Sequence, residues 1–301
     1  MFHPLDVNFR GHANVIAACL LEGGRGPVAL VDPGPSTSLG GLRSALAAHG
    51  RDLSEVDTIL LTHIHLDHAG GTGTILREHP RIKVFVHERG APHMIDPAKL
   101  MASAGRLYGA DMERLWGEMA PVPAENVHVL QGGECVRAAG RELRVEYTPG
   151  HASHHVSYFD PETRTAFVGD TAGVRMGEAP VVVPPTPPPE VDFEAWDASI
   201  RQILAWQPER VFLTHFGAFD SPAEHLEDLR ARSREWLSAA ERLVDDQALT
   251  DEQRMSKFAE TARGSIARLV GEETAAACNL AVPFEHCWLG LARYLRRRAR
   301  V

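Results

Sequence analysis

Residues 56–73 read VDTILLTHIHLDHAGGTG, a short apolar run followed by four potential metal ligands and a glycine-rich turn. The run at 56–61 contains neither Pro nor Gly and has the length of a β-strand. Residues two apart in an extended chain point the same way, so His63 and His65 can hold one cation together. The glycines that follow predict a turn before a helical stretch at 74–79. Such a turn can direct Asp67 and His68 toward a second cation.

Three further candidate ligands follow strand-like runs elsewhere in the chain. These runs and ligands are 143–147 before His151, 165–169 before Asp170, and 210–214 before His215. Loops at strand ends often carry function because a rigid sheet holds them in place. The sequence therefore predicts a site for two adjacent divalent cations, with candidate ligands His63, His65, Asp67, His68, His151, Asp170 and His215.

The order of these ligands resembles the metallo-β-lactamase superfamily, in particular its dinuclear hydrolases such as hydroxyacylglutathione hydrolases (glyoxalase II) and lactonases. The resemblance covers roughly residues 5–225 and includes the VDPG turn at 31–34. It implies an α/β fold, the αββα sandwich, with the metals at one sheet edge. It also implies a division of ligands: His63, His65 and His151 on the first metal, Asp67, His68 and His215 on the second, and Asp170 as the bridge.

The ligand types indicate the chemistry. Imidazole and carboxylate suit zinc, and iron or manganese as well, and we expect two Zn²⁺ per chain. A zinc-bound water has its pKa lowered toward about 7, which supplies hydroxide for attack on a carbonyl carbon. Asp67 is also placed to orient that hydroxide. We therefore predict a zinc-dependent hydrolase that cleaves a small carboxylic ester, lactone or thioester, with metal stabilisation of the oxyanion as the largest catalytic contribution.

Other functions share parts of this pattern. Persulfide dioxygenases are similar to this chain in the HxHxDH stretch, but they use a single iron to oxidise a thiol-derived substrate. Phosphodiesterases and nucleases of the superfamily share all the ligands, but 31 basic against 40 acidic residues, a net charge of −9, argue against a nucleic-acid partner. True β-lactamases generally lack the bridging aspartate, and flavodiiron relatives usually carry glutamate at the position of His65. A non-catalytic zinc module is disfavoured because structural zinc sites are usually rich in cysteine.

The remaining histidines are not expected to bind metal. His154 and His155 are close to His151, and we expect them to support the ligands or to lie on the surface. The same expectation holds for His3, His12, His49, His79, His87, His93, His128, His225 and His286.

Length and composition predict one large domain with an appendage. The chain has 301 residues, of which 44% are hydrophobic and 24% charged. We place a catalytic domain at 1–221 and a C-terminal helical region at 222–301, with helices expected at 222–249, 252–270 and 275–300. The apolar face of the last helix could support a homodimer.

The chain also carries cues to its compartment. No apolar run reaches the roughly 18–20 residues of a membrane helix, and the first residues lack the features of a signal peptide. The four cysteines have no CxxC spacing and predict neither a disulfide framework nor a zinc ribbon. We therefore expect a cytoplasmic protein that acts on a small-molecule substrate and has no membrane partner.

Two further segments bear on the choice of substrate. Residues 88–120 contain broken helical pieces with many apolar side chains, including Tyr108 and Trp116, and could cover the metals as a lid or pack on the sandwich. The dense prolines at 181–190 exclude a regular helix, and this loop could form a wall of the site or a rigid connector. Asp192 is the expected N-cap of the next helix.

Overall fold

Two six-stranded sheets form the centre of the protein, seen in a computed structural model that describes residues 1–24, 26–176 and 181–299. The first sheet has the spatial order β1 (Phe2–Asp6), β2 (Ala17–Leu21), β3 (Val28–Val31), β4 (Val56–Leu60), β5 (Lys83–His87) and β6 (Val127–Leu130). The second has the order β12 (Gly217–Phe219), β11 (Arg210–Leu213), β10 (Thr165–Phe167), β9 (Val156–Asp160), β8 (Arg141–Tyr147) and β7 (Cys135–Ala138).

The strands of the structure match the apolar runs that the sequence predicted to be strands. In the first sheet β3 to β6 pair in parallel, and β3 is buried along its whole length. Parallel strands with both faces covered read as continuous apolar runs, as β3 (VALV) does, whereas β4 (VDTIL) carries the exposed Asp57 near its start. The predicted strand at 56–61 is confirmed as β4, although it ends at Leu60 and leaves His63 and His65 in the loop beyond it. The predicted strands before Asp170, His151 and His215 are confirmed as β10, β8 and β11.

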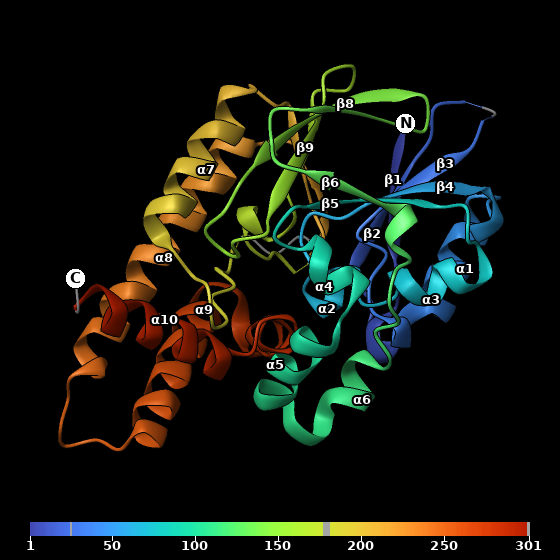
Figure 1. Cartoon of the computed structure of the whole chain (residues 1–301). Coiled ribbons are helices and arrows are strands. Elements are labelled where there is room, and N and C mark those ends of the chain that lie inside the picture. Colours follow the sequence, from blue (N-terminus) through green and yellow to red (C-terminus); the bar gives the residue numbers. More distant parts are fainter. Residues whose placement is uncertain (25, 177–180, 300–301) are drawn as a thin grey trace.

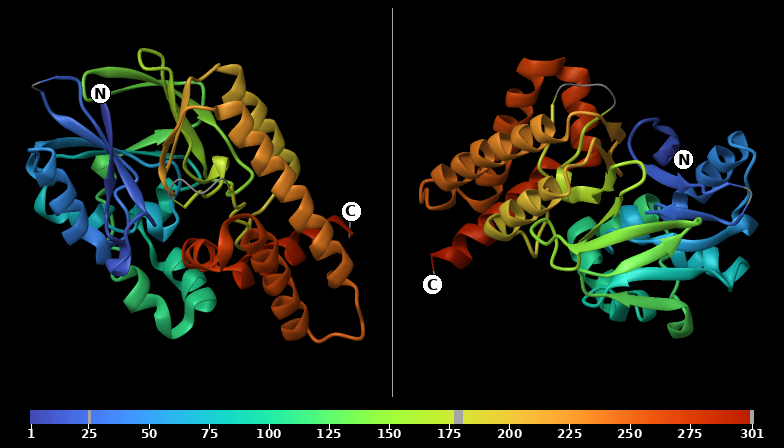
Figure 2. Two further views of the ribbon diagram at one scale, coloured as in Figure 1. Left: turned by 180° about the vertical axis from the view of Figure 1, so that it is seen from behind. Right: turned by 90° about the horizontal axis from the view of Figure 1, so that it is seen from above.

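Helices cover both outer faces, which gives the αββα order of layers (Figures 1 and 2). Residues such as Val31, Phe167 and Phe212 fill the space between the two sheets. The first sheet is flanked by α1 (Leu39–Ala48), α3 (Thr72–Glu78) and α4 (Ala91–Ile95), and the second by α7 (Phe193–Ala205) and α8 (Pro222–Val244). Asp192 caps α7, because its side chain accepts a hydrogen bond from the Ala195 backbone N–H, as predicted.

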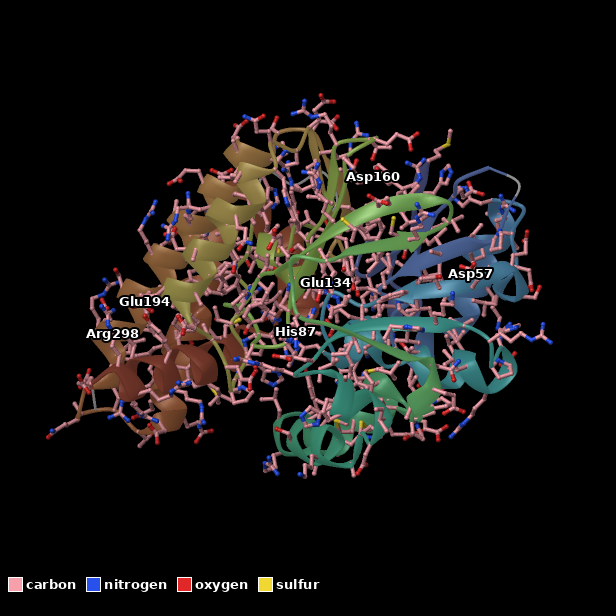
Figure 3. The ribbon with its side chains drawn as sticks, turned by 45° about the horizontal axis from the view of Figure 1, so that its top comes forward. Asp57, His87, Glu134, Asp160, Glu194 and Arg298 are labelled. Carbon is pink, nitrogen blue, oxygen red and sulfur yellow. The ribbon has the colours of Figure 1, made fainter. Side chains whose placement is uncertain are left out.

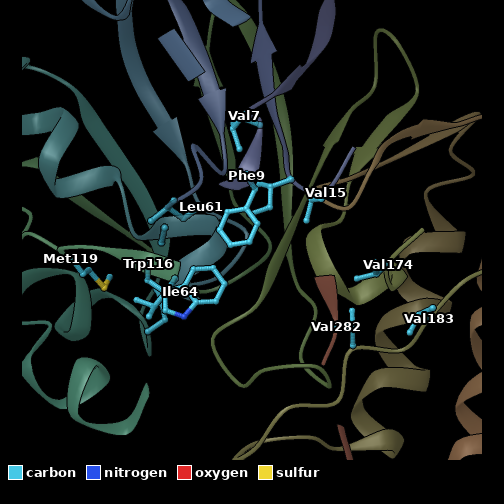
Figure 4. Packing of buried hydrophobic residues seen from close by; sticks show 14 of the residues in the cluster. Val7, Phe9, Val15, Leu61, Ile64, Trp116, Met119, Val174, Val183 and Val282 are labelled. Carbon is cyan, nitrogen blue, oxygen red and sulfur yellow. The ribbon is translucent and has the colours of Figure 1, made fainter. Parts of the chain in front are cut away.

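The segment 88–120 forms α4 and two further helices, α5 (Ala98–Tyr108) and α6 (Met112–Trp116). Trp116 is buried and stacks on Phe9 with ring centroids 5.5 Å apart, so α6 packs on the body of the protein (Figure 4). No residue of α5 is fully buried. Helix α6 is thus packed through a buried side chain, whereas α5 touches the core only through partly buried residues such as Leu100 and Met101.

The chain ends in α8, α9 (Asp251–Ala281) and α10 (Phe284–Arg298), where sequence periodicity predicted helices. The predicted interruption after residue 270 corresponds to Gly271, whose φ of 84° breaks the helical path inside α9. The last helix begins at Phe284 rather than near residue 275, because Pro283 follows a non-helical Val282. Within the described ranges no helix is both long and apolar enough to cross a bilayer.

The last helix is anchored to the second sheet's helical layer. Tyr294 donates a hydrogen bond from its hydroxyl to Glu194 at 2.7 Å, and the Arg298 guanidinium lies 3.9 Å from the same carboxylate (Figure 3). One turn earlier in α10, Gly290 lies against the backbone of Thr186 in the proline-rich loop. Helices α9 and α10 thereby lie at the same end of the sandwich as α5 and α6 (Figure 1).

Replacing Gly290 tests how closely α10 lies against the loop. A Cβ at this position would sit 2.0 Å from the Thr186 carbonyl oxygen, so Gly290→Ala must displace backbone and should destabilise the fold by about 1–3 kcal/mol. Gly264→Ala in α9 is the matched control, since its Cβ would meet only Arg268 at 3.8 Å and should stabilise the helix by about 0.5–1 kcal/mol. Thermal unfolding of both variants measures the difference, and equal melting temperatures would contradict the close contact.

Candidate metal centre

All seven predicted ligands converge at one edge of the sandwich. His63 lies in the loop after β4, His65 stands at the N-cap of the short helix α2 (Leu66–Ala69), and Asp67 and His68 belong to that helix. The others arrive from the second sheet: His151 after β8, Asp170 in the helical turn Gly169–Ala172 after β10, and His215 after β11. They form three groups whose potential ligand atoms lie within 4.8 Å of one another: His63, His65 and His151; Asp67, His68 and His215; and His63, His68 and Asp170.

The first group consists of three imidazoles. Nδ1 of His65 lies 3.0 Å from Nε2 of His63 and 2.9 Å from Nε2 of His151. His63 and His151 are buried, and His65 is half-buried at the edge of a cavity. Three ring nitrogens aimed at one point provide the donor set of a zinc-type site with a position left for solvent or substrate.

The second group combines a carboxylate with two imidazoles. Nε2 of His215 lies 3.2 Å from Oδ2 of Asp67, and Nε2 of His68 lies 3.6 Å from the same oxygen. His68 and His215 are buried, whereas Asp67 retains some exposure to the cavity. This set mixes nitrogen and oxygen donors, which zinc, iron and manganese all accept.

Asp170 lies between the two groups. Its Oδ2 is 3.4 Å from Nε2 of His151, whereas its Oδ1 is 3.3 Å from Nε2 of His68 and 3.9 Å from Nε2 of His215. One carboxylate oxygen therefore faces each group. This is the arrangement that a bridging ligand requires.

The ring orientations follow from hydrogen bonds on the opposite side of each imidazole. Nδ1 of His68 donates to Asp32 at 2.8 Å, Nδ1 of His151 to the Pro185 carbonyl at 2.8 Å, and Nδ1 of His215 to the Val15 carbonyl at 2.6 Å. A histidine that uses one ring nitrogen as a donor to the protein presents the other as a free lone pair. These bonds therefore aim Nε2 of all three rings into the centre.

Burial and mutual proximity set the protonation states. Burial, followed by the neighbouring imidazoles, holds the pKa values of His63 and His65 well below the ordinary histidine range. Burial lowers the pKa of His68 too, but Asp170, Asp67 and Asp32 outweigh it and raise that pKa well above the usual value. Although burial raises the pKa of Asp67, His68 and His215 lower it to about 2. The carboxylates are thus ionised, and the three-imidazole group is neutral.

Two buried polar atoms of the centre lack a hydrogen-bond partner within the described part of the chain and are suited to bind divalent cations. Nε2 of His68 and Oδ1 of Asp170 are buried and have no hydrogen-bond partner among the residues the structure describes. In the same part of the chain, no lysine or arginine forms an ion pair with Asp32, Asp67 or Asp170. Buried carboxylates and lone pairs of this kind are costly unless a cation binds them. The residues present therefore suit divalent metal.

Comparison with known proteins agrees with this geometry. The model of the metallo-beta-lactamase superfamily matches residues 13–215. The chain belongs to the metallo-beta-lactamase superfamily. A metallo-beta-lactamase fold-containing protein of Sulfurisphaera tokodaii is 29% identical over 233 residues, which cover 75% of this chain and 82% of that protein. Hydroxyacylglutathione hydrolase of Synechococcus is 33% identical over 118 residues, 39% of this chain and 35% of that enzyme.

Solved structures show the same fold. A metallo-beta-lactamase family protein of Thermus thermophilus superposes with a TM-score of 0.73 at 24% identity, over 99% of this chain and 94% of that one. A second structure, TTHA1623 in a di-iron-bound form, is 28% identical with a TM-score of 0.51, over 71% of this chain and 93% of that one. The αββα architecture that the resemblance implied is thus confirmed, and one solved structure of this fold is in a di-iron-bound form.

Asp32 is a buried residue of the metal centre to which the sequence pattern gave no role. It is fully buried and accepts hydrogen bonds from the Thr62 backbone and hydroxyl, from the Thr214 hydroxyl, and from His68. Thr62 Oγ1, which donates to Asp32, also lies 3.1 Å from Nδ1 of His63. The signal that could have revealed it is a charged residue placed directly after β3, where a buried strand ends.

His154 and His155 lie beside the centre but outside the three ligand groups. Nδ1 of His155 contacts the hydroxyls of Thr148 and Thr171 at 3.0 and 3.1 Å, and the His154 ring stacks on His63 at 6.0 Å. Burial lowers the pKa of His154 to about 3. Both rings therefore act as neutral packing around the ligands, in line with the expectation that they support the site.

A cavity of about 620 Å³ opens onto the centre. His65, Asp67, His151 and Asp170 line its floor. Its walls come from three separate segments: α5, the prolines between 185 and 189, and the junction of α9 with α10. The proline-rich loop is thus a wall of the cavity. The insertion and the C-terminal helices, which are distant in sequence, enclose the same space.

Metal content distinguishes ligands from their neighbours. His151→Ala removes a donor that both His65 and Asp170 face, so the variant should lose at least one equivalent of bound metal. His154→Ala removes another buried imidazole from the same loop and should retain the wild-type stoichiometry. Elemental analysis of the purified variants measures the ratio. Equal metal loss in both would contradict the assignment.

The hydrogen bond between Asp32 and His68 is expected to control metal affinity. Asp32→Asn keeps the side-chain shape but weakens the bond that orients His68, so metal affinity should fall about 10–100-fold. Asp57→Asn, on the exposed side of β4 (Figure 3), is the matched control and should leave affinity unchanged. Competition with a chromogenic chelator gives both affinities, and an Asp32→Asn protein with wild-type affinity would show that Asp32 has no influence on the metals.

Proposed function

We propose that this protein is a zinc-dependent hydrolase with two metal ions, which cleaves a small carboxylic ester, lactone or thioester. The observation that carries the proposal is the opening of the seven-ligand centre into one cavity with largely apolar walls. Catalytic zinc sites keep an open position, and here the open side faces a space large enough for a small substrate.

The positions of the side chains indicate which residues would bind each cation and which would act on water. His63, His65 and His151 would hold one cation, Asp67, His68 and His215 the other, and Asp170 would contact both. When bound, such cations lower the pKa of water and polarise a carbonyl group. Asp67 is the carboxylate that remains partly exposed to the cavity, so it can accept a proton or a hydrogen bond from the attacking water.

The walls of the cavity support a carbonyl substrate with an apolar portion. Leu100 and Leu107 of α5 face the same space as Val282 and Leu289. Aliphatic side chains on opposite sides bind an acyl chain or a lactone ring by removing apolar surface from water. The name of the hydroxyacylglutathione hydrolases, which resemble part of this chain, denotes a thioester substrate. This name favours an acyl ester or thioester as the bond that is cleaved here.

The competing functions differ in metal count. A dioxygenase with one iron needs two histidines and an aspartate, whereas this centre also gathers a complete second donor group. Two arginines, Arg106 and Arg293, line the cavity beside its aliphatic residues, while the net charge of −9 argues against a phosphodiester polymer, whose binding depends on neutralised phosphates.

A substrate panel tests the proposal. Purified protein loaded with Zn²⁺ should hydrolyse one or more members of a set of lactones, carboxylic esters and acyl thioesters, without consuming oxygen. Phosphodiesters and β-lactams serve as the comparison classes. Oxygen uptake with one iron per chain, or turnover confined to phosphodiesters, would contradict the proposed reaction.

Asp67 provides the accompanying variant. Asp67→Ala removes a carboxylate from the cavity floor and should lower kcat at least 100-fold, because both a metal donor and the acceptor for water are lost. Asp57→Ala is the control for an exposed carboxylate on the same chain segment. Full activity in Asp67→Ala, with the fold intact by circular dichroism, would refute the role given to Asp67.

A further inference from the structure

Tyr108 is held rigidly at the wall of the cavity. It is the last residue of α5, and the chain turns away at Gly109 with a φ of 54°. Its ring meets Trp116 edge-on at 5.2 Å and His286 edge-on at 5.1 Å. Because one neighbour belongs to α6 and the other to α10, the ring joins the insertion to the C-terminal helices.

The hydroxyl of this tyrosine differs from those of the other three. Tyr147 donates to the Ser153 carbonyl at 2.8 Å, Tyr158 to the Leu61 carbonyl at 2.8 Å, and Tyr294 to Glu194 at 2.7 Å. Within the described ranges, Tyr108 has no hydrogen-bond partner, although its side chain lines the cavity. The Tyr108 side chain is half-buried and lines the cavity, so its hydroxyl is free to donate a hydrogen bond to a ligand bound there.

The surroundings keep this hydroxyl protonated and near the centre. Burial raises the pKa of the Tyr108 hydroxyl well above the ordinary tyrosine value, and the negative charges of Asp67 and Asp170 add to the effect. The phenol is therefore a neutral donor throughout the range in which hydrolysis is expected. Asp67 and Asp170 of the metal centre line the same cavity as Tyr108, so this side chain shares the space into which the centre opens.

We propose that the Tyr108 hydroxyl donates a hydrogen bond to the carbonyl oxygen of the substrate as that oxygen becomes an oxyanion. This inference rests on the proposed hydrolysis of a carboxylic ester, lactone or thioester. The attack of water converts the carbonyl carbon from trigonal to tetrahedral and places negative charge on its oxygen, and a preorganised donor stabilises that charge. The rings of Trp116 and His286 fix the donor in place, so little reorganisation is needed.

The variant that isolates the hydroxyl is Tyr108→Phe, because it keeps the ring and both aromatic contacts. Tyr294→Phe is the matched control, since it removes a tyrosine hydroxyl from α10 whose partner is Glu194. With the ester or thioester that the wild type hydrolyses fastest, Tyr108→Phe should lower kcat about 10–100-fold, with KM changed less than about threefold. Tyr294→Phe should stay within about twofold of wild type in both constants.

The affinity for a tetrahedral anion tests the role of the Tyr108 hydroxyl without measuring turnover. Hexylphosphonate carries a tetrahedral anionic head on an apolar chain, and titration calorimetry with the zinc-loaded protein gives its Kd. We expect Tyr108→Phe to bind it at least about tenfold more weakly than wild type, while Tyr294→Phe binds equally, because a lost donor to an anion weakens binding by this amount. Metal content should match wild type in both variants, and the melting temperature should match it in Tyr108→Phe.

The outcomes separate this inference from the proposed function. Absence of turnover on the whole panel refutes the proposed function, and the phosphonate titration then still decides the role of Tyr108. Equal phosphonate affinity in Tyr108→Phe and wild type, or no binding to wild type, overturns the inference. A loss of kcat that Tyr294→Phe shares, or one that appears only as a rise in KM, overturns it as well.

Discussion

Buried carboxylates that pair with no lysine or arginine of the described residues are the constraint on which this site depends. Asp32 and Asp170 are almost fully withdrawn from solvent, Asp67 is only partly exposed, and histidines are their charged neighbours. Desolvating so much negative charge is expensive unless cations lie within a few ångströms. Divalent ions meet that need and also accept the imidazole lone pairs. The same interaction can therefore stabilise the folded edge of the sandwich and supply its chemistry.

The fold supplies the ligands from two sheets, and this arrangement explains the spacing in the chain. The first sheet provides Asp32 after β3 and the HxHxDH stretch after β4, whereas the second provides His151, Asp170 and His215 from three further loops. Apolar packing between the sheets holds the loops in register. Helical segments that follow or interrupt the sandwich then close a cavity over its edge, so metal binding and substrate selection come from different parts of the sequence.

Much of the site was predictable because its signal is local. The pairing of His63 with His65, and the strand at 56–61, follow from periodicity and residue type within one short segment. Asp32 and the carbonyls of Val15 and Pro185 escaped prediction, because their roles arise from tertiary contacts between residues 30 to 200 positions apart. The position of Tyr108 at the junction of α5, α6 and α10 likewise depends on long-range packing that no periodicity encodes. The start of α10 at Phe284 was missed because helical residues continue on both sides of Pro283.

The central claim is that the seven side chains hold a pair of metal ions. Crystals of the zinc-loaded protein, measured on both sides of the zinc absorption edge, test it most directly through anomalous difference density. The account predicts two peaks about 3.5–4 Å apart, one among His63, His65 and His151 and the other among Asp67, His68 and His215, with Asp170 between them. A single peak, or zinc bound only at other residues, would contradict it.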